Sequence, residues 1–519
     1  MKKIVGFTLL ITLISYLLLL SKYLVIEEIL GFYLIPILLV IIVASLLYGL
    51  IRIFKAISYK KTIINSLLVA CILQIGIISL ILWSATPRYF SRNQVIKDID
   101  YAIKIAEDVH PNLYAVISKE SFYAKTDSIK KTFPEKMSDA AAYRTLGRIF
   151  SQIQDGHTGG GWNFFDKRGS GAFRKTLPYK INIKDERLFI SKNYFYRNTI
   201  PIGSEILEIN GKPSNQCLQE ISQLISYEII PFRNSILKNP MFWGLWNDFK
   251  DFKITYKTPQ DNQIKTIKAS GGLISKLLFL KDSKNTGKAY KFKTIKSNIG
   301  FLEFNKFRDL DKFKLFLDTT FTKIKKENVN NLIIDIRKNG GGNSSLGDEL
   351  MQYISKTDFN TFDSGMVKIS EELTKNGMLN WLDSSQQKIG RLHSFFDTSK
   401  TKLRDNPLRF NGNTFLLIGG NTFSSATNFA SVFQCYNVGE IIGDETGGLT
   451  VSFGDVYRFI LPNTRFDMGV SYKKFYNACG VDNRRGVIPD YIVKNSFEDE
   501  QKRIDRVLDF TIDLIKEDE

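Results

Sequence analysis

The stretch Leu332-Ile333-Ile334-Asp335-Ile336-Arg337-Lys338-Asn339-Gly340-Gly341-Gly342 joins a short apolar run to a glycine-rich turn. An apolar run of this length, rich in β-branched residues, predicts a buried strand. Three glycines after a strand let backbone N–H groups point at a ligand, as an anion or oxyanion site requires. The simpler interpretation is that the glycines only close the turn. Asp335 and Arg337 are expected to pair, because a buried carboxylate needs a partner.

A second turn follows the apolar run 414–418 and reads Gly419-Gly420-Asn421-Thr422-Phe423-Ser424-Ser425-Ala426. A serine here would lie at the N-terminus of the next helix, near the positive end of the helix dipole. Serine is also a favoured N-cap, so the position alone does not establish chemistry. Expected strands alternate with expected helices at 299–304, 310–325, 332–336, after Asn343, at 414–418 and after Ser425. This alternation predicts a largely parallel α/β core over 290–519.

Two other regions precede this core. Residues 88–160 have apolar residues at helical spacing and are expected to form a helical subdomain. It ends in the loop Gln154-Asp155-Gly156-His157-Thr158-Gly159-Gly160-Gly161, where the glycines favour a tight turn. Residues 176–275 are expected to be β-rich, because polar and apolar residues alternate in stretches such as 252–256.

Within the β-rich region, Pro201-Ile202-Gly203-Ser204-Glu205-Ile206-Leu207-Glu208-Ile209-Asn210-Gly211-Lys212-Pro213 resembles the core of a PDZ domain. PDZ domains capture extended peptides by adding them as a strand to an exposed sheet edge. The resemblance implies that Gly203, Ile206 and Ile209 contribute to substrate binding. A PDZ-like domain over 176–275 would therefore present or gate an extended polypeptide.

Composition excludes some classes of protein. The 519 residues hold 71 Lys+Arg against 53 Asp+Glu, with 24% charged and 44% apolar residues, which excludes broad disorder and a single small module. No helix-turn-helix, zinc finger or aromatic RNA-binding motif accompanies the positive charge, so nucleic acid is not an expected partner. The four cysteines show no C-x-x-C spacing, so neither a zinc site nor a disulfide scaffold is predicted. We expect no metal and no cofactor.

The N-terminal region 1–87 is expected to be a membrane anchor. Three stretches, Ile4 to about Ile26, Leu30 to about Ile53 and Ile63 to about Trp83, approach or exceed the ~20 apolar residues that span a bilayer. Cationic residues flank the first span and fill the loop between the second and third, which places those regions in the cytoplasm. Three spans would then place the remaining chain on the periplasmic or extracellular side. A channel or transporter is disfavoured, because the spans lack charged residues at their centres.

A serine nucleophile needs a base, and the chain has only three histidines. His393 lies in a charged stretch and is interpreted as a solvated surface residue. His110 ends a helix, where capping explains it. His157, in its glycine-rich loop, is the strongest candidate.

Taken together, the motifs resemble the tail-specific, or C-terminal processing, serine peptidases. The resemblance runs from about Asn93 to Val493. Its motifs follow in order: Asp155-Gly156-His157-Thr158, the PDZ-like string, the 332–342 stretch, Thr422-Phe423-Ser424-Ser425-Ala426-Thr427-Asn428-Phe429-Ala430, Ile442-Gly443-Asp444-Glu445-Thr446-Gly447-Gly448 and Gly486-Val487-Ile488-Pro489-Asp490. It implies a ClpP/crotonase-like catalytic core and a polypeptide substrate.

The resemblance also implies roles for individual residues. In the family, the nucleophile is the serine three positions before a Glu, and Asn428 stands in the position of that Glu here. The resemblance therefore implies Ser425 as the nucleophile, with Ser424 as the alternative. The processing peptidases use a lysine base about 25 residues further on, but the matching stretch 447–450 has none. The tricorn-type branch uses a histidine from the earlier loop, and His157 stands in that position.

In the tricorn-type branch, a Glu near the final Pro-Asp motif orients the base, and Asp482 occupies the similar place. A serine that precedes the histidine in those enzymes is Gly156 here. By the same resemblance, the N–H groups of Ala426 and of Gly341 or Gly340 would hold the oxyanion.

The resulting hypothesis is a membrane-anchored serine endopeptidase that cleaves peptide bonds outside the cytoplasm, with assembly into a homo-oligomer left open. One alternative is a catalytically silent ligand- or peptide-binding protein on the same fold, because the lysine base is missing. Another is a membrane-bound assembly or signalling factor whose remaining domain only docks partners.

Overall fold

The computed structural model describes residues 88–160, 174–195, 199–274, 277, 288–296, 298–383, 388–395, 400–502 and 504–517. The chain divides into two compact units. The larger unit comprises Tyr89–Gly161, Thr176–Gly271 and Asn285–Glu519, and it holds every element discussed below. The smaller unit lies mostly outside the described residues; its described part includes Lys175 of β4 (Lys175–Thr176) and β11 (Gly272–Leu273).

The expectation of an integral, multi-pass membrane protein is corrected. Across the described ranges, no helix combines the length and the apolar character that a bilayer crossing requires. The longest of them, α5 (Arg92–Val109), has 18 residues and carries charged side chains along its length, among them Lys97 and Lys104, which a bilayer centre disfavours. The three expected spans fall on residues 1–87, outside the described residues, and they are not retained as part of the fold.

The C-terminal region forms the expected α/β core. Its six-stranded sheet has the order β12-β13-β14-β17-β18-β21. Strands β13 to β21 run parallel along this order, and only the edge strand β12 is antiparallel. The strands are β12 (Tyr290–Lys296), β13 (Ile299–Phe304), β14 (Asn331–Asp335), β17 (Asn413–Ile418), β18 (Glu440–Gly443) and β21 (Tyr491–Ile492).

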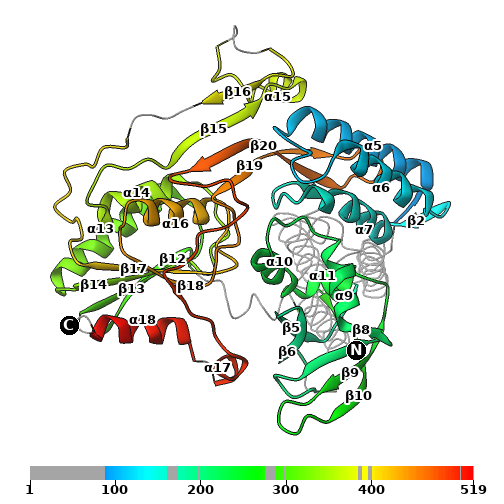
Figure 1. Ribbon diagram of the computed structural model, residues 1–519, viewed down its shortest axis with the longest axis horizontal. Helices are drawn as coiled ribbons and strands as arrows, with labels where there is room; N and C mark the ends of the chain where they lie inside the picture. Colours follow the sequence, from blue (N-terminus) through cyan, green and yellow to red (C-terminus); the bar gives the residue numbers. More distant parts are fainter. Residues whose placement is uncertain are drawn as a thin grey trace, which may run out of the picture. The chain divides into compact units, whose positions relative to one another are not determined.

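Helices cover both faces of this sheet. Figure 1 shows α14 (Ser345–Ile354) and α16 (Ser425–Cys435) above the sheet and α18 (Arg506–Glu517) below it. Alternate residues of β14 face opposite ways: Leu332 and Ile334 join the core with α13 (Leu310–Lys326), α14 and α16, while Ile333 joins the core with α18. Burial on both faces explains why this strand is a continuous apolar run.

The helical region contains α5, α6 (Lys119–Lys131) and α7 (Asp139–Phe150), together with the paired strands β1 (Tyr89–Ser91) and β2 (Lys136–Ser138). A capping box starts α5, because Ser91 accepts a hydrogen bond from the Gln94 N–H and the Gln94 side chain accepts one from the Ser91 N–H. After α7, the turn η1 (Ser151–Ile153) leads into the His157 loop and the short strand β3 (Gly159–Gly160).

A third sheet joins that loop to the rest of the C-terminal half. Its order is β16-β15-β20-β19, and β3 pairs with β20 through Gly159 and Gly160. The strands are β15 (Phe362–Lys368), β16 (Leu392–Phe395), β19 (Val451–Ile460) and β20 (Asp467–Asn477). The pairing of β3 with β20 fixes the position of the chain two residues after His157. The short helices α15 (Glu371–Lys375) and α17 (Phe497–Lys502) complete the C-terminal half.

The β-rich region contains a sheet with the order β10-β9-β7-β6-β5, and β8 pairs with β7. Its elements are β5 (Tyr179–Lys184), β6 (Arg187–Asn193), β7 (Glu205–Ile209), β8 (Lys212–Pro213), α9 (Ser214–Ser222), α10 (Ile230–Leu237), α11 (Pro240–Leu245), β9 (Asp251–Lys257) and β10 (Ile264–Ser270). The segment between α9 and α10 contains Glu228.

One covalent link was not predicted. Cys435, the last residue of α16, and Cys479, two residues after β20, form a disulfide with a Cα–Cα distance of 5.6 Å. The two cysteines are 44 residues apart, so no local spacing signals the pair. The disulfide ties the far end of α16 to the segment that contains Asp482.

Candidate active site

The turn between β17 and α16 presents two serines in different environments. Ser424 is the N-cap of α16 with φ 56° and ψ −127°, a conformation that residues with a side chain rarely adopt. The glycine turn after β14 lies directly against it: a Cβ at Gly341 would come within 2.8 Å of the Ser424 Cβ and 2.9 Å of the Ser425 nitrogen. Gly341 also has φ 92°, so a side chain at this position is excluded by both contact and conformation.

Ser425 is the first residue of α16. Its hydroxyl donates a hydrogen bond to the Gly342 carbonyl oxygen at 2.7 Å. The Ser425 N–H has no acceptor within its own helix, as is general for the first helical turn, and no side chain caps this helix end. The turn therefore anchors the Ser425 hydroxyl, and it leaves the Ser425 N–H, next to Ser424, without an acceptor in the helix.

Two of the N–H groups expected in an oxyanion hole already have acceptors. The Gly341 N–H donates to Asn339 Oδ1 at 2.9 Å, and the Ala426 N–H donates to the Phe423 carbonyl oxygen at 3.2 Å. Within the described residues, the Gly340 N–H has no acceptor, and a Cβ at Gly340 would meet open space. Gly340 and Ser425 therefore each offer an N–H with no acceptor among the described residues, one in each turn.

The expected pairing of Asp335 with Arg337 is confirmed. The guanidinium of Arg337 donates to both oxygens of Asp335 at 2.9 and 2.7 Å, and to both oxygens of Asp505 at 2.7 Å each. Burial lowers the pKa of Arg337, but the hydrogen bonds and charges of the two carboxylates outweigh it and raise the pKa above its usual range. Bidentate pairing on two sides fixes the start of the glycine turn.

The His157 loop is held by its own aspartate. Asp155 accepts hydrogen bonds from the His157 N–H at 2.9 Å and from the Thr158 hydroxyl at 2.5 Å. The Thr158 hydroxyl oxygen in turn accepts from the Ser471 N–H of β20 at 3.0 Å. These contacts explain why the Asp-Gly-His-Thr string forms a defined turn.

His157 lies over the residue that precedes Ser424. Its ring stacks on Phe423 with centroids 4.7 Å apart, and Phe423 stacks on Phe232 at 4.0 Å. A Cβ at Gly156 would come within 2.8 Å of the Phe423 ring and 2.9 Å of the Phe232 ring. Tricorn-type enzymes have a serine where this chain has Gly156. The glycine has a steric reason here, because the aromatic stack leaves no room for a side chain.

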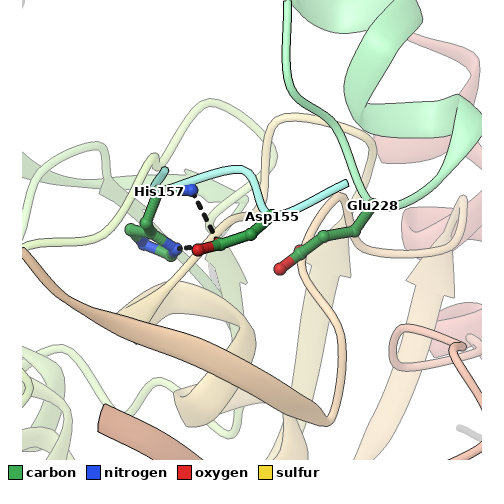
Figure 2. A group of neighbouring side chains, drawn as sticks. All are labelled: Asp155, His157 and Glu228. Atoms are coloured by element: carbon green, nitrogen blue, oxygen red, sulfur yellow. Dashed lines mark hydrogen bonds and ion pairs between the residues drawn. The ribbon is translucent and has the colours of Figure 1, made fainter. Parts of the chain in front are cut away.

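Asp155, rather than Asp482, is the carboxylate beside His157. His157 Nδ1 lies 3.8 Å from Asp155 Oδ1. Figure 2 draws this contact as a dashed line. Asp482 instead accepts a hydrogen bond from Lys474 Nζ at 2.6 Å, and its side chain is 48% exposed. Asp482, which is expected from the sequence to orient His157, therefore has Lys474 as its partner.

Asp155 also binds His110, a contact that sequence reasoning missed. His110 Nδ1 accepts a hydrogen bond from the Asn112 N–H at 3.1 Å, so the proton of a neutral His110 lies on Nε2, which donates to Asp155 Oδ2 at 3.3 Å. Burial raises the pKa of Asp155, but the hydrogen bond and charge of His110, followed by the charge of His157, hold it below its usual range. Asp155 is thus an anion inside the protein.

Two further groups have perturbed protonation. Burial lowers the pKa of His157, and the charges of Asp155 and Asp455 oppose this shift only in part. Burial, followed by the negative charge of Asp155, raises the pKa of Glu228 well above its usual value. A histidine that stays neutral at neutral pH is able to accept a proton from a serine.

The remaining predicted positions lie elsewhere. His393 is on β16, away from the His157 loop in sequence and sheet position. Ile206 and Ile209 are fully buried in β7, which has strands on both sides, and Gly203 lies in the preceding turn with φ 87°. The two isoleucines therefore serve the core of the β-rich region and not a substrate surface.

Comparisons with known proteins agree with this architecture. Residues 298–493 match the model of Peptidase family S41. Mature CPAF complexed with lactacystin has a TM-score of 0.61 at 14% identity, covering 82% of this chain and 99% of that one, and mature CPAF alone gives 0.59 at 14%, covering 82% and 98%. The photosystem II D1 C-terminal processing protease gives 0.41 at 14%, covering 77% and 93%. No curated protein sequence shows significant similarity to the chain.

The fold and the matched region define a mixed α/β peptidase. Residues 298–493 form a domain of Peptidase family S41, the tail-specific or C-terminal processing serine peptidases, and the chain is a serine peptidase, a class of enzyme that acts on polypeptides. The resemblance drawn from the ordered motifs is confirmed.

Proposed function

We propose that the chain is an endopeptidase in which His157 activates a serine of the 422–426 turn. The observation that carries this proposal is the stacking of His157 on Phe423, 4.7 Å between centroids, which brings the only histidine of the loop to the residue before Ser424. The Asp155 carboxylate stands 3.8 Å from Nδ1 of the same ring. A base between a hydroxyl and an orienting carboxylate is the arrangement that nucleophilic catalysis requires.

Ser424 is the better candidate for the nucleophile, although the sequence motif favours Ser425. Ser424 occupies the strained position of a strand-to-helix turn, where a nucleophilic serine is exposed to substrate, and the free Ser425 N–H follows it directly. The Ser425 hydroxyl is engaged by the Gly342 carbonyl oxygen, which suits an anchoring role. The assignment also explains the close approach of Gly341 to the Ser424 Cβ.

The reaction then follows from the positions of these groups. His157 takes the proton from the Ser424 hydroxyl as the oxygen attacks the scissile carbonyl carbon, and it later returns a proton to the leaving amine. The carboxylate of Asp155, 3.8 Å from Nδ1, stabilises the imidazolium through its negative charge. The N–H groups of Ser425 and Gly340 receive the oxyanion; loss of one such donor typically costs ~10²–10³ in turnover.

The β-rich region is proposed to present the substrate as an extended strand. The edges open to strand addition in the described sheet are β5 and β10, because β6, β7 and β9 have strands on both sides. The substrate-presenting edge is therefore assigned to one of these two strands and not to β7.

A fluorophosphonate probe tests the nucleophile directly. We expect the purified full-length chain to be phosphonylated at Ser424, located by peptide mass mapping. Ser424→Ala removes labelling and peptide hydrolysis, a loss on the order of 10⁶-fold in serine peptidases. Ser425→Ala loses about 1 kcal/mol of stability from one hydrogen bond and keeps hydrolysis within roughly tenfold of wild type. An adduct on Ser425 instead would reverse the assignment, and no adduct on a folded chain would refute the proposal.

A further inference from the structure

Glu228 is a buried carboxylate near the positive charge of Arg484, whose guanidinium donates to Gln154 and to the Glu228 backbone oxygen and not to the Glu228 side chain. The residue is 7% exposed, and neither of its side-chain oxygens has a hydrogen-bond partner in the part of the chain that the structure describes. Figure 2 shows its carboxylate on the same side as Asp155 and directed toward it. Two buried carboxylates side by side need a cation or a shared proton between them.

A third unpartnered atom lies at the same place. His157 Nδ1 is buried and has no hydrogen-bond partner within the described residues. One oxygen of Asp155, one of Glu228 and a ring nitrogen of His157 all lie within 4.8 Å of one another. The proposed peptidase chemistry accounts for His157 and Asp155, but it gives no role to Glu228.

We propose that Asp155, His157 and Glu228 bind a Zn²⁺ ion through one atom each. An imidazole nitrogen with carboxylate oxygens is a donor set that zinc accepts, and three protein ligands leave a fourth position open. Ligand atoms about 2.0–2.2 Å from a tetrahedral zinc are about 3.4 Å apart. Side-chain rotation therefore has to contract the cluster by roughly 1 Å. The divalent charge would balance the two carboxylates.

The bound ion would inhibit the enzyme, an inference that rests on the proposed function of His157. A metal on Nδ1 uses that nitrogen's lone pair, so the proton of the neutral ring lies on Nε2. Nε2 then has no lone pair with which to accept the serine proton. The zinc ion would also take the place of the Nδ1 proton that faces Asp155 in catalysis. Zinc binding and base catalysis are thus mutually exclusive at this histidine.

Zinc binding is measured first by isothermal titration calorimetry, on the full-length chain stripped of metal with a chelator. We expect one equivalent of Zn²⁺ in wild type and at least a 100-fold weaker Kd in Glu228→Gln and in His157→Ala. Glu220→Gln is the matched control on α9, because the Glu220 carboxylate instead accepts hydrogen bonds from Lys212 and Trp246. His393→Ala controls for binding by another histidine. Both controls should bind as wild type does.

The second measurement is the rate of fluorophosphonate labelling with and without Zn²⁺. Wild type should lose labelling as zinc saturates, while Glu228→Gln should keep its own zinc-free rate at the same concentration. The proposal would be overturned if folded wild type had no stoichiometric zinc site, or if Glu228→Gln and His157→Ala bound zinc with wild-type affinity. Either result would favour a proton shared by the two carboxylates. If zinc binds but the metal-free chain never labels, the peptidase mechanism fails and the zinc site stands.

Discussion

His157 owes its position to neighbours that have little in common in the sequence. Asp155 fixes the turn through the His157 N–H, and Phe423 supports the ring from the other turn. The motif Asp-Gly-His-Thr made His157 and Asp155 visible as neighbours, but it carried no sign of which acid orients the ring. Asp482 was inferred from sequence order near the final Pro-Asp motif, and Lys474 occupies its carboxylate.

Gly156 gives a prediction at the residue scale. Gly156→Ala should force the Phe423 and Phe232 rings apart, because its Cβ would lie 2.8 and 2.9 Å from them. Such overpacking costs roughly 1–3 kcal/mol, and displacement of His157 should lower kcat by about 10²-fold. Urea denaturation and peptide-hydrolysis assays measure the two effects. Gly419→Ala is the control, since its Cβ would meet nothing closer than 3.9 Å. Equal kcat in both variants would show that the aromatic stack does not position the base.

At the scale of elements, the pattern of apolar residues predicted the buried strands, because burial determines which positions are apolar. The apolar run 332–336 had to be a strand covered on both faces, and α13, α14, α16 and α18 cover it. The pairing of β3 with β20, and the disulfide from α16 to the segment after β20, join residues far apart in the chain. Such contacts leave no local pattern, and they are the ones that assemble the site.

The start of α18 is expected to stabilise the glycine turn through Asp505. Burial raises the pKa of Asp505, but its hydrogen bond and charge pairing with Arg337, helped by Lys338, lower it below the usual value. The pairing therefore stabilises the fold above the unfolded pKa of about 3.9, and this contribution is lost as pH falls through the folded pKa. Because the side chain is 38% exposed, solvent screening limits the contribution to at most about 1 kcal/mol.

Asp505→Asn isolates that charge, since asparagine still caps the helix where Asp505 accepts from the Leu508 N–H. Urea denaturation should show wild type more stable than the variant at pH 7, with the difference shrinking below about pH 4. Asp513→Asn, on the same helix and paired with Lys516, should change little, because Asp513 is 65% exposed. A difference for Asp505→Asn that persists unchanged at pH 2 would mean that charge pairing with Arg337 is not its source.

For the whole molecule, the proposed catalytic groups His157 and Ser424 are separated by some 270 residues of chain. The ordered motifs revealed the kind of enzyme, because each motif is local. Docking of the helical region on the core depends on long-range contacts that no motif carries. Asp98 of α5 provides one of these: its carboxylate accepts hydrogen bonds from the N–H and side chain of both Asn463 and Thr464, in the turn between β19 and β20.

This docking predicts an effect on catalysis from a residue that contacts no catalytic group. Asp98→Ala leaves four donors without their acceptor and should destabilise the chain by about 2–4 kcal/mol. Because β3 reaches β20 through the same hairpin, the His157 loop should open more often, and amide exchange of residues 155–160 should accelerate while that of β14 does not. Labelling by fluorophosphonate should slow to the extent that the fraction of chains with a closed His157 loop falls. Asp100→Ala is the matched control two residues away, since Asp100 is 57% exposed and pairs with Lys130 of the same helical region. If Asp98→Ala slowed labelling without faster exchange at 155–160, docking of the helical region would not be what positions His157.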